Sequence, residues 1–170
     1  IWGGSIEFTT PMLYAVAFIP SFVMGGVTGI MQAAAPADYQ YHDSYFIVAH
    51  FHYVIVGGVV FGLLAGLHYY WPIMFNTMLN EVLGKITFVL FVFGFHLTFL
   101  IQHFLGLWGM PRRVFTFLDG QGYNAANMIS TVGAAILGVS VLPFIWNIFK
   151  SWRYGEVVTV DDPWGAGNSL

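Results

Sequence analysis

The chain has 170 residues, of which 58% are hydrophobic and 8% are charged, with a formal net charge of −3 and a mean hydropathy of +0.73. Soluble proteins carry about 25% charged residues, so this composition excludes an ordinary soluble domain, and the small net charge gives no indication of nucleic-acid binding. The sequence has no cysteine, which excludes disulfides, thiolate metal sites and cysteine nucleophiles.

Four stretches without Asp, Glu, Lys or Arg are long enough to cross a membrane: 8–37, 44–80, 86–111 and 120–149. A helix needs about 20 apolar residues to span the bilayer core, whereas the apolar part of a signal peptide has only about 7–15. We therefore predict an all-α fold, a polytopic transmembrane helix bundle. Residues 1–170 would form a single integral membrane region without a separate extramembrane domain. Because Ile1 stands directly before a span, we expect a piece of a longer protein.

In chain order, the expected spans are 8–32, 44–70, 86–108 and 124–149, followed by a polar tail at 150–170. A loop is expected at 33–42. The second span is expected to stop at Trp71-Pro72, because proline lacks the N–H that continues a helix.

Basic residues suggest the orientation of this bundle. By parity, Lys85, Lys150 and Arg153 fall on the side of the tail, and Arg112 and Arg113 fall on the other side. Cytoplasmic loops carry the excess of Lys and Arg, so the tail is expected in the cytoplasm by three charges to two.

The most informative feature of the second span is a pair of histidines, His50 and His52, inside a stretch without charges. Successive helical residues turn by about 100°, so these two side chains point about 200° apart and cannot easily chelate one metal together. Ionisable residues in spans are functional hypotheses by default, and imidazole is an axial ligand of heme iron. Each histidine is a candidate ligand for its own cofactor; the alternative is a pair of hydrogen-bonded packing residues.

The remaining span histidines give weaker signals. His68 lies about 27 Å along the helix axis from His50, so the two cannot share a cofactor, and we expect His68 at the membrane interface. We expect His96 to hydrogen-bond across the bundle. His103 lies closer to the depth of the histidine pair and is a candidate for supporting a cofactor there.

Two polar groups flank the histidine pair at one membrane face. Arg112 and Arg113 follow the third span and suit heme propionates, because guanidinium binds carboxylates through paired hydrogen bonds; ordinary anchoring of a helix end is the alternative. His42 and Asp43 precede the second span and are candidates for a divalent cation such as magnesium. The alternative is a helix-capping Asp.

Two segments resemble a known family. HDSYFIVAHFHYV at 42–54 resembles the signature of subunit I of the heme–copper terminal oxidases, and QHFLGLWGMPRR at 102–113 is similar to a second landmark of that family. The resemblance covers nearly the whole chain and corresponds to the last four of twelve helices, so it implies a C-terminal fragment of cytochrome c oxidase subunit I or a close relative.

The resemblance implies a role for each matching residue. His50 would be the axial ligand of the high-spin heme and His52 a ligand of the low-spin heme, with heme a expected at both sites. His42 and Asp43 would bind magnesium together with a carboxylate of subunit II. Asp38 would lie near a heme propionate, and the Arg112 and Arg113 guanidinium groups would bind propionates. The copper ligands and proton channels lie on earlier helices, so no residue of this chain is assigned as catalytic.

The implied activity is the reduction of O2 to water, coupled to proton pumping. The Met110-Pro111 pair before the arginines and Tyr53 after His52 are more similar to the cytochrome c branch than to the quinol branch. Subunit II and further oxidase subunits, cytochrome c and the lipid bilayer are the expected partners, and a bacterial plasma membrane is the expected location. A quinol oxidase, a diheme membrane cytochrome that only passes electrons, and a multi-helix transporter remain alternatives.

Overall fold

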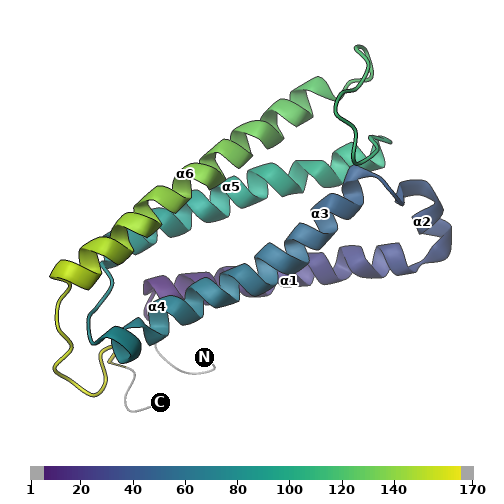
Figure 1. Ribbon diagram of the computed structural model, residues 1–170. Helices are drawn as coiled ribbons and strands as arrows, with labels where there is room; N and C mark the ends of the chain where they lie inside the picture. The colour runs from purple at the N-terminus through teal and green to yellow at the C-terminus, as the bar shows by residue number, and fades with distance from the viewer. Residues whose placement is uncertain (1–5, 166–170) are drawn as a thin grey trace.

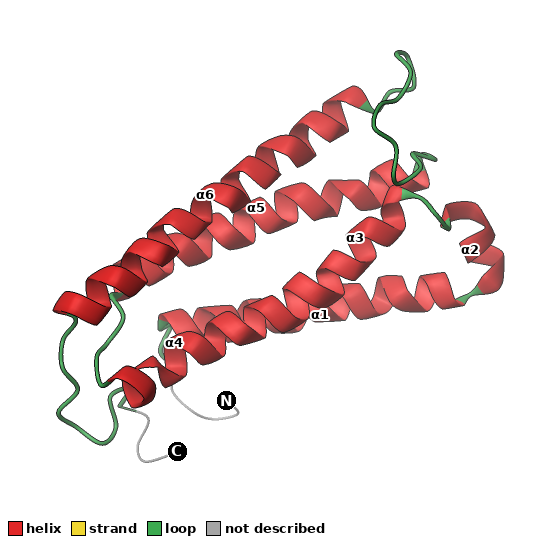
Figure 2. Cartoon of the chain, viewed as in Figure 1, coloured by secondary structure: helices red, strands yellow, loops and turns green. Residues whose placement is uncertain are grey.

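The computed structural model describes residues 6–165, and within them every long element is a helix (Figure 2). The elements are α1 (Thr10–Ala33), α2 (Ala35–Tyr41), α3 (Tyr45–Val54), η1 (Ile55–Val60), α4 (Phe61–Phe75), α5 (Glu81–Leu107) and α6 (Asn124–Tyr154). The described part contains no strand, only two isolated bridges between loops. The predicted all-α fold is confirmed.

Four helical stretches are long and apolar enough to cross a membrane: α1, the continuous run Tyr45–Phe75, α5 and α6. They form two pairs, α1 beside α3–η1–α4 and α5 beside α6 (Figure 1). α3 and α5 also pack together, which joins the two pairs at the end where α2 lies. The prediction of four spans agrees with this arrangement.

The second span contains a π-helical segment, η1, that the sequence pattern did not reveal. It coincides with Gly57 and Gly58, which face α1. A Cβ on Gly57 would lie 2.8 Å from Ser21 Cβ, and one on Gly58 would lie 2.8 Å from Phe22 Cδ2. The two glycines therefore allow α1 to approach this segment closely. Such π segments inside α-helices are frequent at functional sites.

Several helix ends differ from the expected ones. The second span continues through Pro72 and ends at Phe75, where Asn76 adopts a left-handed conformation with φ of 56° and terminates the helix. Residues 35–41, expected as part of a loop, form the short helix α2. α5 begins at Glu81 because the Asn80 side chain caps it, accepting a hydrogen bond from Leu83 N at 3.0 Å. α6 continues into the expected tail, to Tyr154.

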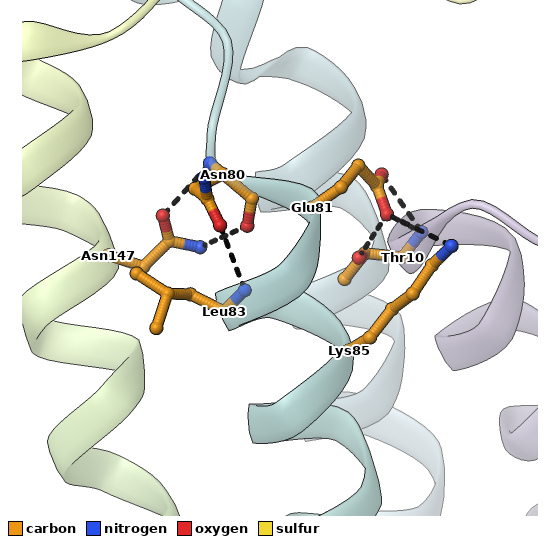
Figure 3. A network of polar contacts seen from close by, with 6 residues as sticks. All are labelled: Thr10, Asn80, Glu81, Leu83, Lys85 and Asn147. Carbon is orange, nitrogen blue, oxygen red and sulfur yellow. Dashed lines mark hydrogen bonds and ion pairs between the residues drawn. The ribbon is translucent and has the colours of Figure 1, made fainter.

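Polar contacts connect the helices at the end opposite α2 (Figure 3). The Glu81 carboxylate accepts hydrogen bonds from the backbone N–H and the hydroxyl of Thr10, the latter at 2.8 Å, and lies 3.7 Å from Lys85 Nζ. Asn147 exchanges two hydrogen bonds with the backbone of Asn80, at 2.9 and 3.0 Å. These contacts fix the start of α5 against both α1 and α6.

Candidate cofactor site

His50 is held by the neighbouring helix α1. Its Nδ1 lies 3.0 Å from the carbonyl oxygen of Gly25 and 3.1 Å from the hydroxyl of Thr28. Gly29 leaves the room that the ring occupies, since a Cβ there would lie 2.9 Å from His50 Cε1. The imidazole is half-buried, and its position depends on the close approach of α1 and α3.

His52 is held in a different way and on a different side. Its Nδ1 lies 2.7 Å from the carbonyl oxygen of Val48, one turn earlier on its own helix. Its ring stacks on Phe99 of α5, with 3.9 Å between ring centroids and 13° between planes. The two histidines therefore pack against different helices, α1 and α5, as the one-residue spacing predicts.

Both imidazoles have the form that a metal-binding histidine needs. When Nδ1–H donates to a carbonyl oxygen, Nε2 keeps its lone pair for a metal, and the hydrogen bond of Nδ1 fixes the plane of the ring. The donor set of His50 and His52 therefore fits axial ligation of two separate hemes, one on each side of α3. Neither ring is fully enclosed by the described residues.

Tyr53 forms a polar link that sequence reasoning missed. Its side chain is fully buried, and its hydroxyl lies 2.7 Å from Nδ1 of His96 on α5. The expected hydrogen bond of His96 across the bundle is thereby confirmed. A search for a hydroxyl at the same depth on the neighbouring span would have suggested Tyr53 as the partner of His96.

His103 lies in the same layer but without a polar partner. It is 5% exposed, and neither ring nitrogen has a hydrogen-bond partner within residues 6–165. Its ring packs edge-on against Phe46, with centroids 5.1 Å apart, and lies 5.3 Å from the Tyr53 ring. A buried imidazole with two free nitrogens between α3 and α5 is consistent with a supporting position beside a cofactor.

The surface loops bring together three of the predicted polar residues. The Arg112 Nη2 lies 2.7 Å from Asp43 Oδ1, and its Nε donates to the same oxygen at 2.9 Å. His42 Nδ1 lies 3.6 Å from the other oxygen of Asp43. The sequence assigned Arg112 and Asp43 to different ligands, whereas the structure joins them as an ion pair between the loop before α3 and the loop after α5.

The remaining candidates lie apart from this cluster. Arg113 is exposed, with φ of 64°, and its side chain forms no ion pair or hydrogen bond in the described chain. Asp38 lies on α2 and is half-buried. No group of three or more His, Asp or Glu side chains able to hold a metal occurs among residues 6–165, so His42 and Asp43 are not joined by a third such side chain there.

Comparison with known proteins identifies relatives of this chain. The family model described as "Cytochrome C and Quinol oxidase polypeptide I" matches residues 1–136. The chain is 68% identical over its whole length to cytochrome c oxidase subunit 1 of Bacillus sp. (strain PS3) and 62% identical to that of Bacillus subtilis (strain 168). In both cases it spans 27% of the length of the relative.

A solved structure of a heme–copper terminal oxidase dimer has the same fold. The match has a TM-score of 0.77 at 19% identity and covers 88% of this chain and 28% of that chain. At this level of identity the likeness shows the arrangement of the helices alone.

Proposed function

Because this chain belongs to the cytochrome c and quinol oxidase polypeptide I family, we propose that it is part of the catalytic subunit of a respiratory terminal oxidase. The complete enzyme would reduce O2 to water with electrons from cytochrome c, coupled to proton pumping. The observation that carries this proposal is the separate fixation of His50 and His52 on two sides of α3.

His50 would ligate the high-spin heme and His52 the low-spin heme, with heme a as the expected type. When bound, the hemes and the copper supply the electron transfer and the oxygen chemistry. The chain's own residues hold the ligands in place. The Gly25 carbonyl and the Thr28 hydroxyl orient the His50 ring, and the Val48 carbonyl and the Phe99 ring orient that of His52. The copper would be bound by residues outside this chain.

The polar surface loops would receive the acidic ends of these cofactors. Arg112 and Arg113 would bind heme propionates, with Asp38 near one of them, and His42 and Asp43 would contribute to a magnesium site completed by subunit II. Support comes from the Arg112–Asp43 ion pair, which lies at the end of the bundle nearest the histidines. Through this pair, the guanidinium and the carboxylate would couple the propionate region to the cation site.

Cytochrome c is the proposed donor because the relatives matched at 62% and 68% identity carry the name cytochrome c oxidase subunit 1. Subunit II and further oxidase subunits would complete the complex, in a bacterial plasma membrane with the C-terminus in the cytoplasm. The matched family also includes quinol oxidases. Turnover of the purified enzyme with reduced cytochrome c and with a quinol in parallel would decide between the two donors.

The heme assignments are tested by spectroscopy of the full-length subunit in its complex. We expect His50→Ala to remove the heme that binds carbon monoxide and abolish oxygen consumption, and His52→Ala to remove the low-spin heme signal. Tyr70→Phe is the control, since Tyr70 is exposed and lies about 30 Å from His50 along the helix. Two intact heme spectra in both alanine variants would refute the assignment. Two six-coordinate hemes without carbon monoxide binding in the unmodified protein would instead indicate a diheme cytochrome.

A further inference from the structure

Two buried polar groups lie outside the histidine layer, in the half of the bundle far from α2. Tyr14 on α1 is fully buried, and His68 on α4 is 2% exposed. The expected position of His68 at the depth of the membrane interface stays a prediction, and the structure adds that its side chain is buried between the spans. Within residues 6–165, neither the Tyr14 hydroxyl nor His68 Nε2 has a hydrogen-bond partner.

The two side chains are neighbours with complementary chemistry. Their ring centroids lie 5.7 Å apart, with 33° between the planes. His68 Nδ1 lies 2.8 Å from the carbonyl oxygen of Leu64, so Nδ1 carries the proton and Nε2 is an acceptor. The Tyr14 hydroxyl can both donate and accept. A donor and an acceptor thus lie on neighbouring rings of α1 and α4, and no hydrogen bond joins them directly.

The surroundings decide what kind of ligand fits between them. Aromatic rings enclose the pair: Phe61, Phe88 and Phe91 lie around Tyr14, and Phe144 of α6 lies 6.0 Å from His68. Apolar walls make an ion costly to bury. Among the described residues, His68 belongs to no group of three or more His, Asp or Glu side chains that could hold a metal. The Glu81 carboxylate acts on His68 electrostatically but is already bound by Thr10 and Lys85. A small neutral molecule that both accepts and donates hydrogen bonds fits the two unpartnered groups.

We propose that Tyr14 and His68 bind one buried water molecule. The water accepts a hydrogen bond from the Tyr14 hydroxyl and donates one to His68 Nε2. Buried waters in proteins typically satisfy polar groups that would otherwise lack partners. The site is independent of the proposed oxidase function, since His68 lies about 27 Å along the second span from His50 and the site uses no partner of His50 or His52.

The direct test is a structure of the complete oxidase, at a resolution that shows ordered water. The expected result is density for one water within about 2.7–3.2 Å of both Tyr14 Oη and His68 Nε2. A direct hydrogen bond between the two side chains would overturn the proposal, and so would an empty space between them.

A variant gives a second test: the direction in which it shifts the thermal unfolding midpoint distinguishes a site that holds water from one that does not. If a water is bound, Tyr14→Phe removes one of its partners and lowers the thermal unfolding midpoint of the complex. If the hydroxyl is dry and unpartnered, the same substitution removes an unsatisfied buried group and raises the midpoint. Tyr70→Phe is the matched control, because Tyr70 lies on α4 together with His68 but is 52% exposed. An unchanged or raised midpoint in Tyr14→Phe overturns the proposal.

Discussion

The fixation of His50 by α1 predicts a specific effect of one added methyl group. In Gly29→Ala the new Cβ would stand 2.9 Å from His50 Cε1, whereas two carbon atoms prefer a separation of at least about 3.5 Å. The ring must therefore move by about 0.6 Å, or the two helices must separate by a similar amount. The hydrogen bond from Nδ1 to the Gly25 carbonyl, now 3.0 Å, would lengthen beyond the usual range. Overpacking of this kind costs about 1–3 kcal/mol.

The measurement uses the full-length subunit in its complex. We expect Gly29→Ala to shift or broaden the carbon monoxide difference spectrum of the heme proposed to bind His50 and to lower oxygen consumption, while the low-spin spectrum stays unchanged. Gly26→Ala is the matched control, since nothing lies within 4 Å of a Cβ at that position of the same helix. If both variants gave the same spectrum and turnover as the unmodified enzyme, the fixation of His50 by α1 would not determine the ligand geometry.

Two further predictions concern the surface ion pair and the packing of α5 against α6. Arg112→Ala removes the partner of Asp43. We expect it to shift the heme midpoint potentials, measured by redox titration, and to slow turnover while both hemes stay bound. If the variant behaved like the wild type, anchoring of the helix end would be the only role left for Arg112. Gly133→Ala would place a Cβ 2.5 Å from the backbone nitrogen of Thr98 and is expected to destabilise the subunit by about 1–3 kcal/mol, read as a lower unfolding midpoint. Gly138→Ala, with open space around its Cβ, is the control, and equal midpoints for the two variants would contradict the tight packing of the helices.

The sequence predicted what depends on composition and simple periodicity. Charge-free length located the four spans, and the one-residue gap between His50 and His52 placed their rings against different helices. It could not predict features that arise from contacts between spans. Pro72 remains inside a helix, and His68 is buried against Tyr14 of α1 and Phe144 of α6. The Arg112–Asp43 pair joins residues 69 positions apart, and no local pattern encodes such a contact.

The two histidines differ in what determines their orientation, and this difference follows from glycine positions on α1. Gly25 approaches α3 so closely that a Cβ there would lie 3.1 Å from the backbone carbon of Tyr53, and its carbonyl thereby reaches His50. His52 instead depends on a carbonyl of its own helix and on an aromatic neighbour from α5. Changes in the spacing of α1 and α3 should therefore act on the His50 side alone. A single span can then support two different ligand environments, because one imidazole is positioned by contacts between helices and the other by contacts within its own.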